Sequence, residues 1–255
     1  MSVAPDPVRL VPRPVFLLSS IRSGSTLLRC LLDSHPAVHA PHELHLRYLH
    51  ATITSEYTEL AMATLGYSDN DLRYLLWDGI LADRLRRSGK AVLVDKSPSN
   101  TFIHEDLRRC WPRARFIVLR RHPADIVASI VNADDGRDEA EATELVLRYA
   151  RELDAVVDRD PGTPVVQYED LAGKPARVCA ELCRFLEVPF DESMLDYGRH
   201  DHGPLVYGIG DWGEKIRSGK VHAPWPPAAR TVTGELAELC RRWRYPTGDR
   251  SGAAL

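Results

Sequence analysis

The sequence predicts an α/β fold in three layers, in which a central, mostly parallel sheet is flanked by helices. Three short apolar runs, at 15–18, 91–95 and 115–119, lack polar alternation and are typical of parallel strands buried on both faces. Apolar residues at helical spacing separate these runs. Strands that alternate with helices in this way form parallel sheets with right-handed connections.

The first half of the chain supplies three strands and the helices between them. The run VFLL at 15–18 is followed by leucines at helical spacing between 27 and 32. Residues 68–71 supply capping chemistry for a helix that precedes the run AVLVD at 91–95. A short apolar helix is expected to begin near Pro123, behind the run RFIVL.

The second half continues the alternation. A long amphipathic helix is predicted from about Glu139 to Val157, and TPVVQY at 163–168 makes a fourth strand. Pro175 suits the first turn of the next helix, because its missing N–H would have no partner there. A last helix is expected over 232–243.

The length of 255 residues suits one α/β domain and is short for two enzyme domains with a linker. We therefore expect a single domain over 15–245. A flexible leader is expected at 1–14, and a disordered tail at 246–255.

Composition and charge exclude several classes of partner. Hydrophobic residues at 44%, charged residues at 27% and a net charge of −3 describe a soluble globular protein, without the excess of positive charge that nucleic acid or an anionic membrane attracts. No apolar run reaches the length of a membrane span, and the N-terminus lacks a secretion signal, so the cytoplasm is the expected location. Five cysteines without regular spacing are expected to be reduced thiols.

The loop after the first predicted strand has the chemistry of a phosphate site. Residues 19–26, SSIRSGST, offer backbone N–H groups, hydroxyls and a guanidinium at a helix N-terminus, where the helix dipole favours an anion. The alternative is a plain turn whose serines only cap the helix. A Walker-type nucleotide loop needs an earlier glycine and a lysine, and this segment has Arg22 before Gly24 instead. The loop therefore predicts a phosphate site without an evident metal partner.

Five segments carry a resemblance to a known family. SSIRSGSTLLRCLLDSHPAVHAPHELHL resembles the phosphosulfate-binding segment of sulfotransferases, in particular the branch of tyrosylprotein sulfotransferases and the sulfotransferase domains of polyketide synthases. FIVLRRHPADIVAS resembles the second signature of that family, and VDKSP resembles a strand end that carries a lysine. VQYEDLAGKPARVCAELCRFLEVPF is similar to a late strand, loop and helix, and GIGDWGEKIRSGKVH to a closing loop. The fold that this resemblance implies is P-loop-like.

The resemblance implies that the co-substrate is 3′-phosphoadenosine 5′-phosphosulfate, which has two separated anionic ends. In the first loop it implies that the donor is bound by Arg22, Ser23, Gly24, Ser25, Thr26 and Leu27. The resemblance implies that Arg121 and Ser129 bind the ribose 3′-phosphate. The closing segment, unless it is only a solvated turn, adds Arg217, Ser218, Gly219 and Lys220.

Sulfuryl transfer resembles phosphoryl transfer, so it needs cations around the moving group and a base for the acceptor. By resemblance Lys96 contacts the sulfuryl group, and Arg22 is a second candidate cation. Glu43 stands at the position of the catalytic glutamate of tyrosylprotein sulfotransferases. His45 titrates nearer neutrality, and the choice of base between Glu43 and His45 stays open.

The acceptor is expected to offer a hydroxyl group, or less readily an amine. It is expected to be a small molecule, such as a secondary metabolite, or a group bound to an acyl-carrier protein. The sequence HDH at 200–202, with Tyr207 and Trp212, is a candidate lining of the acceptor pocket. His39, His42 and His45 recur every third residue, but no cysteine or carboxylate cluster accompanies them, so we predict no metal site.

Two other functions remain open at this stage. A kinase would share the strand, loop and helix but would require the lysine of a nucleotide loop, which is missing. A non-catalytic nucleotide-binding module could keep both phosphate sites without Lys96 and Glu43, which are present here.

Overall fold

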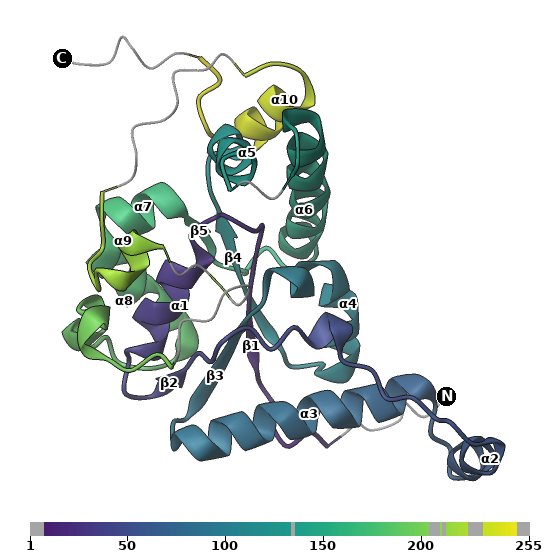
Figure 1. Cartoon of the computed structure of the whole chain (residues 1–255). Coiled ribbons are helices and arrows are strands. Elements are labelled where there is room, and N and C mark those ends of the chain that lie inside the picture. Colours follow the sequence, from purple (N-terminus) through teal and green to yellow (C-terminus); the bar gives the residue numbers. More distant parts are fainter. Residues whose placement is uncertain (1–7, 134–135, 204–209, 211–212, 224–231, 249–255) are drawn as a thin grey trace.

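Five parallel strands form the centre of the molecule (Figure 1). The computed structural model describes residues 8–133, 136–203, 210, 213–223 and 232–248. The strands lie in the order β2-β3-β1-β4-β5, and every neighbouring pair is parallel. Their bounds are β1 Val15–Ser19, β2 Val38–His39, β3 Val92–Lys96, β4 Arg115–Arg120 and β5 Val165–Gln167.

Helices follow the strands in the alternation that the sequence predicts. The α-helices in the described part of the chain are α1 Ser25–Asp33, α2 Glu56–Thr64, α3 Asp69–Ser88, α4 His104–Cys110, α5 Pro123–Val131, α6 Glu139–Arg159, α7 Tyr168–Gly173, α8 Pro175–Leu186, α9 Glu214–Arg217 and α10 Gly234–Arg242. The short 3₁₀ turns are η1 Leu46–Tyr48, η2 Pro98–Ile103, η3 Glu192–Leu195 and η4 Tyr197–Arg199. The predicted cap of α3 is present, because Ser68 and Asp71 form a reciprocal capping box.

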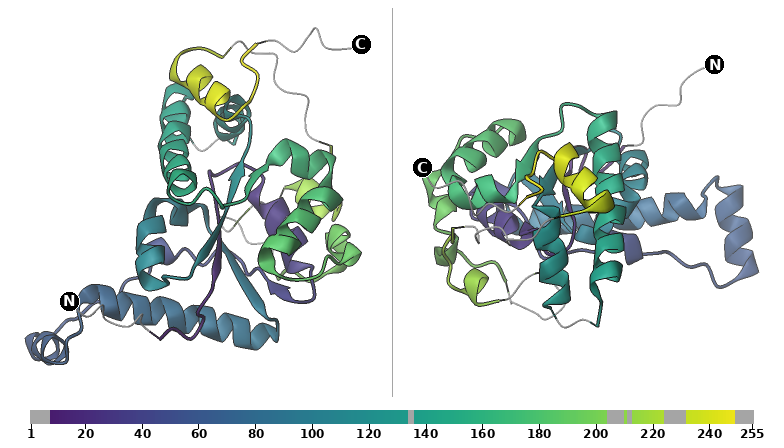
Figure 2. Two further views of the ribbon diagram at one scale, coloured as in Figure 1. Left: turned by 180° about the vertical axis from the view of Figure 1, so that it is seen from behind. Right: turned by 90° about the horizontal axis from the view of Figure 1, so that it is seen from above.

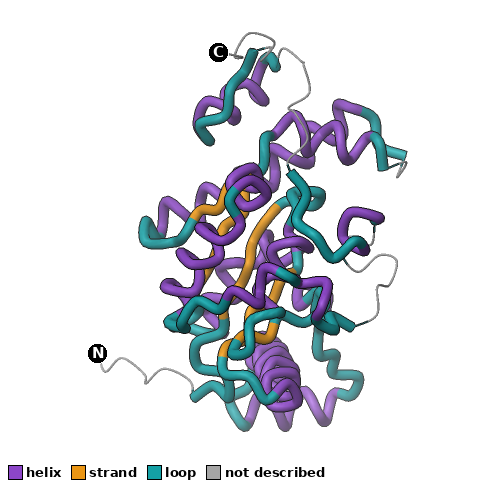
Figure 3. The backbone as a smooth tube through the Cα atoms, turned by 90° about the vertical axis from the view of Figure 1, so that its left-hand side faces the viewer, coloured by secondary structure: helices purple, strands orange, loops and turns teal. Residues whose placement is uncertain are grey.

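The sheet separates two apolar cores, because successive side chains of a strand point to opposite faces. Phe16 and Leu18 pack on one face with residues of α3, α4, α5, α6 and α10. Val15 and Leu17 pack on the other face with residues of α1, α7 and α8. Figure 2 shows these helices on the two sides of the sheet, and Figure 3 shows the strands enclosed by helices. The predicted three-layer α/β architecture is confirmed.

Some local details differ from the sequence prediction. The fourth predicted strand, 163–168, is shorter than expected, because Tyr168 already begins helix α7. Helix α2 was not predicted; it buries none of its residues and projects from the body of the molecule (Figure 1). Its lack of buried residues explains why it leaves no amphipathic stripe in the sequence.

The ends of the domain make contacts of their own. The N–H groups of Leu10 and Val11 donate to the buried carboxylate of Asp78, so the described part of the expected leader is attached to α3. Residues 1–7 and 249–255 lie outside the described part. All five cysteines are unpaired and buried. Over the described ranges, none of the helices has both the length and the hydropathy to span a bilayer.

Candidate active site

A cavity of about 490 Å³ lies beyond the carboxyl ends of the strands. Its walls come from segments that directly follow β1, β3, β4 and β5, including Arg22, Pro98, Arg121 and Tyr168. Glu43 reaches it from the chain after β2. Parallel strands bring their carboxyl ends to one edge of the sheet, so residues far apart in the sequence meet here.

The loop between β1 and α1 forms one wall of the cavity. Gly24 adopts φ +88°, and a Cβ at this position would overlap the ring of Tyr168. The hydroxyl of Ser23 is buried and donates to the carbonyl of Ser20 at 2.7 Å. No side chain caps the N-terminus of α1. The serines of this loop therefore do not cap the helix. Its N-terminal residues Ser25 and Thr26 line the cavity, where the helix dipole favours an anion.

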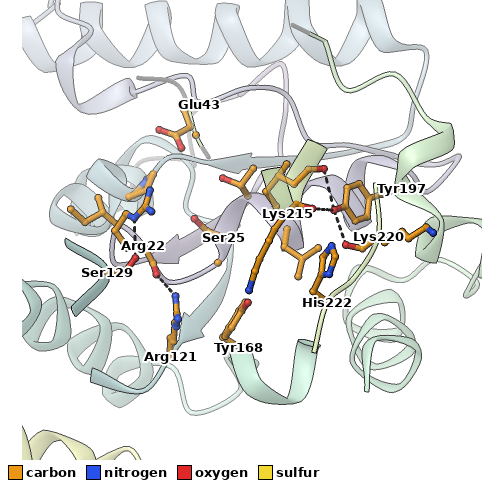
Figure 4. Close-up of a pocket in the computed structure, with 17 residues that line it drawn as sticks. Arg22, Ser25, Glu43, Arg121, Ser129, Tyr168, Tyr197, Lys215, Lys220 and His222 are labelled. Carbon is orange, nitrogen blue, oxygen red and sulfur yellow. Dashed lines mark hydrogen bonds between the residues drawn. The ribbon is translucent and has the colours of Figure 1, made fainter. Parts of the chain in front are cut away.

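The second predicted anion site meets the first one. Arg121 directly follows β4 and donates from Nη1 to the carbonyl of Arg22 at 3.0 Å. Arg22 in turn donates from Nε to the hydroxyl of Ser129 at 3.2 Å (Figure 4). The guanidinium carbon of Arg121 lies 4.8 Å from the ring centroid of Tyr168. Two guanidinium groups and a hydroxyl thus form one continuous polar wall.

Glu43 and Lys96 form an almost fully buried ion pair at the other end of the cavity. The carboxylate also lies 3.1 Å from Nε2 of His45, so Glu43 contacts two of the three other candidate catalytic residues; the third, Arg22, lies in the polar wall. Gly210 covers this pair: a Cβ there would lie 3.3 Å from Thr26 Oγ1 and 3.6 Å from Lys96 Nζ. The structure therefore brings Thr26, Glu43, His45 and Lys96 together.

Burial and pairing shift the pKa values of the ion pair. Burial would raise the pKa of Glu43, but the hydrogen bond from His45 and the charge of Lys96 outweigh it, so the pKa is lowered. Burial lowers the pKa of Lys96, against the opposing charge of Glu43. Arg29 is also buried and adds positive charge beside Lys96. Neither cation lines the cavity, so these desolvated charges attract an anion at this end through their electric field.

Asp95 links the end of β3 to the segment that carries Glu43. Its carboxylate accepts hydrogen bonds from the hydroxyl of Ser97 at 3.1 Å and from the amide of Asn100 at 2.7 Å. The backbone of Leu44 is a further partner. Complete burial raises the pKa of Asp95 to about 6, despite these hydrogen bonds.

The segment 213–223 forms the far wall. The Tyr197 hydroxyl holds it by hydrogen bonds to the carbonyls of Ile216 and Lys220, at 3.2 and 3.1 Å. Gly219 packs on Gly198, where a Cβ on Gly198 would lie 2.7 Å from the Cα of Gly219. Only glycine suits such a close approach of two backbones.

Of the residues predicted in this segment, some line the cavity and others do not. Lys220 contributes to the cavity lining, although Figure 4 shows its ammonium group pointing away from the other labelled side chains. The hydroxyl of Ser218 donates to the carbonyl of Lys215 at 2.7 Å. Arg217, Ser218 and Gly219 do not line the cavity. Their predicted contact with the donor stays a prediction.

Eight lining residues were not among the predicted site residues: Ile21, Pro98, Tyr168, Tyr197, Gly210, Lys215, Ile216 and His222. Tyr168 follows β5 directly, as Arg121 follows β4. It could have been identified because ligands bind beyond the carboxyl ends of parallel strands. Gly210, Lys215, Ile216 and His222 belong to the segment that resembles a closing loop, whereas Tyr197 follows no strand and shows no pattern.

The histidines point to separate partners. His39 Nδ1 lies 3.4 Å from Asp33, whereas His45 contacts Glu43. His202, from the HDH sequence, lies 2.9 Å from Asp33 and does not line the cavity. Within the ranges that the structure describes, no three His, Cys, Asp or Glu side chains are grouped to hold a metal ion. Tyr207 and Trp212 lie outside those ranges.

Comparison with known proteins adds relatives to this geometry. A family model described as "Sulfotransferase family" matches residues 14–192. Nodulation protein NoeE of Sinorhizobium fredii is 32% identical over 131 residues, which cover 47% of this chain and 31% of that protein. Protein-tyrosine sulfotransferase A of Caenorhabditis elegans is 23% identical over 199 residues, which cover 72% and 52% of the two chains. The chain thus spans about a third to a half of the length of these two relatives.

Solved structures share the fold over almost the whole chain. The sulfotransferase domain from the Synechococcus PCC 7002 olefin synthase is 25% identical, with a TM-score of 0.69 and coverage of 96% of this chain and 99% of that domain. The sulfotransferase domain from the curacin biosynthetic pathway is 22% identical, with a TM-score of 0.66 and coverage of 92% and 98%. The P-loop-like α/β fold that the sequence predicts is confirmed.

Gly24→Ala tests the packing of the first loop. The change introduces a Cβ that overlaps Tyr168, in addition to the cost of a positive φ, so it should lower the free energy of unfolding by roughly 2–4 kcal/mol. Gly66→Ala is the matched control, because Gly66 has φ +82° with nothing within 4 Å, and should cost only about 1 kcal/mol. Urea unfolding measures both values. Equal losses in the two variants would show that the contact with Tyr168 is unimportant.

Asp95 should make stability depend on pH. Its pKa of about 6 lies above the value of 3.8 in an unfolded chain, so its contribution to stability is complete below pH 4 and is lost as the pH rises through 6. Relative to Asp95→Asn, the wild type should lose about 2–3 kcal/mol of unfolding free energy between pH 4 and pH 7. Urea titrations at the two pH values give this difference, and a constant difference would contradict the shifted pKa.

Proposed function

Because the chain belongs to the sulfotransferase family, we propose that it transfers a sulfuryl group from 3′-phosphoadenosine 5′-phosphosulfate to a hydroxyl group of an acceptor. The observation that carries this proposal is one cavity lined both by the polar wall of Arg22, Arg121 and Ser129 and by Glu43, which is paired with the buried Lys96. The two ends suit a donor with two separated anionic groups.

The residues present fit that donor. The positive end of the α1 dipole and the guanidinium of Arg22 suit the phosphosulfate, and Arg121 with Ser129 suits the ribose 3′-phosphate. Tyr168 offers an aromatic face inside the cavity. When bound, the donor supplies the activated sulfuryl group. The polar wall and the buried pair then hold its two ends apart.

Glu43 is the proposed base, and Lys96 stabilises the charge that develops during transfer. The acceptor oxygen forms a bond to sulfur while the bond between sulfur and the phosphate oxygen breaks, and the acceptor proton passes to Glu43. The leaving group is adenosine 3′,5′-bisphosphate. An anion beside Lys96 competes with Glu43 for its charge, which frees the carboxylate for the proton. His45 keeps the carboxylate oriented through its contact at 3.1 Å.

The proposed acceptor is a small molecule, such as a secondary metabolite, or a group bound to a carrier protein. Two solved relatives support this class, since one is a domain from the curacin biosynthetic pathway and the other a domain of an olefin synthase. Sulfation of protein tyrosine is the activity that the name of another relative gives. The cytoplasmic location stays a prediction from sequence.

Nucleotide binding tests the donor. Calorimetric titration should show that adenosine 3′,5′-bisphosphate binds at least tenfold more tightly than ATP, with or without magnesium, because the polar wall addresses a 3′-phosphate. Arg121→Ala should weaken the binding of the bisphosphate by about tenfold or more. Arg113→Ala, a change of an exposed arginine outside the cavity, is the control and should leave affinity unchanged. Tighter, magnesium-dependent binding of ATP would point to a kinase instead.

Glu43→Gln tests the base. The amide keeps an oxygen for Lys96 but accepts no proton, so single-turnover transfer of labelled sulfuryl group to a panel of phenolic and hydroxyacyl acceptors should slow by about 10²–10⁴-fold. Bisphosphate affinity, measured by calorimetry, should change by less than about threefold. His45→Gln should have a smaller effect, since His45 acts through Glu43. If His45→Gln is the slower variant, His45 is the base, and if neither variant slows transfer, this pair takes no part in the chemistry.

A further inference from the structure

Two arginines beside the reaction centre have no carboxylate partner in the part of the chain that the structure describes. Arg47 lies in η1, four residues after Glu43, and Arg148 lies on α6. Both guanidinium groups lie over the ring of Phe102, with Cζ 4.7 Å and 5.6 Å from its centroid. The centroid of the Phe102 ring lies 4.5 Å from that of the buried Tyr149 ring, and this packing restricts the position of Phe102 beneath the arginines.

Arg148 has acidic neighbours on its own helix. Glu144 and Glu152 lie four residues before and after it on α6, the spacing at which helical ion pairs form. Arg148 pairs with neither, and Glu152 lies 3.3 Å from His104 instead. Exposed arginines elsewhere, such as Arg86 and Arg109, do pair with carboxylates. Among the described residues, Arg148 therefore lies over Phe102 and forms no ion pair with the acidic side chains of its own helix.

A continuous strip of side chains joins this pair to the proposed base. The His45 ring contacts Glu43 at 3.1 Å and lies 6.2 Å from the Tyr48 ring. Arg47 lies over Tyr48 at 5.6 Å as well as over Phe102. On the other side, η2 begins at Pro98 in the cavity wall and leads to Phe102. The two guanidinium groups thus lie outside the cavity lining, on the side of Glu43 that contacts His45.

Stacking leaves the binding capacity of these arginines intact. A guanidinium that lies over a ring uses its flat face, while its N–H groups point outward in the plane and match the geometry of a carboxylate or a phosphate. Both groups are held by one ring, so binding of one anion by the two arginines would cost little further side-chain entropy.

We propose that Arg47 and Arg148 form a subsite for an anionic group, a carboxylate or a phosphate, on the acceptor whose hydroxyl reaches Glu43. This inference rests on the proposed function and narrows its acceptor class. The anion has two possible sources: a free hydroxy acid, or the phosphate of the pantetheine arm on a carrier protein.

Two matched pairs of probes test the subsite without any need for turnover. The protein is first saturated with adenosine 3′,5′-bisphosphate and then titrated calorimetrically. One pair is 4-hydroxyphenylacetate and 4-hydroxyphenethyl alcohol, and the other is pantetheine 4′-phosphate and pantetheine. The charged member of at least one pair should bind about tenfold more tightly than its neutral partner. The pair that responds identifies the source of the anion.

Variants assign the effect to the two arginines. Arg47→Gln and Arg148→Gln should each remove most of the preference for the charged probe, and Phe102→Leu should weaken it by releasing both side chains. Arg151→Gln is the matched control on the same helix, and it should keep the full preference. All four variants should bind the bisphosphate as the wild type does.

The outcomes separate the two proposals. If the bisphosphate binds but the charged probes bind no better than the neutral ones, or do not bind, the subsite is wrong and the proposed function stands. A preference that survives both arginine changes also overturns the subsite. If the bisphosphate itself fails to bind, the proposed function is wrong.

Discussion

The structure depends on one constraint: five parallel strands deliver their carboxyl ends to a single edge of the sheet. Each strand end then contributes a different chemical group, because the next residues must leave the sheet at that edge. Arg121 and Tyr168 follow their strands directly, and Lys96 is itself the last residue of β3. The backbone topology, rather than any local motif, therefore assembles the cavity.

Electrostatics gives this edge its specificity. Lys96 and Arg29 are buried, while Glu43 is the carboxylate paired with Lys96 and the pKa of Asp95 is raised by burial. A buried cation is costly unless it is paired, so positive charge in excess of negative charge favours an anionic ligand. The chain as a whole carries a net charge of −3, which means that the attraction is local and is built by the fold.

The sequence predicted those parts of the molecule that depend on short-range patterns. Apolar runs identified four of the strands, and the composition of residues 19–26 identified the first loop with Arg22, Gly24 and Thr26. β2 was missed, because two residues are too few to show a pattern. Tyr197 and Lys215 were missed for another reason: neither lies in a periodic stretch of sequence. The Tyr197 hydroxyl and the contact between Gly198 and Gly219 hold the segment 213–223 beside the cavity. Such long-range contacts have no signature in a single sequence.

The burial of all five cysteines has a practical consequence for work on this protein. Burial raises the pKa of the Cys110 and Cys179 thiols to about 12, so they scarcely form the reactive thiolate at neutral pH. In the native fold these thiols should therefore resist air oxidation and react slowly with maleimide dyes. A single cysteine introduced at an exposed position would carry a fluorophore without prior removal of the natural ones, which makes the chain a convenient scaffold for following ligand capture by fluorescence.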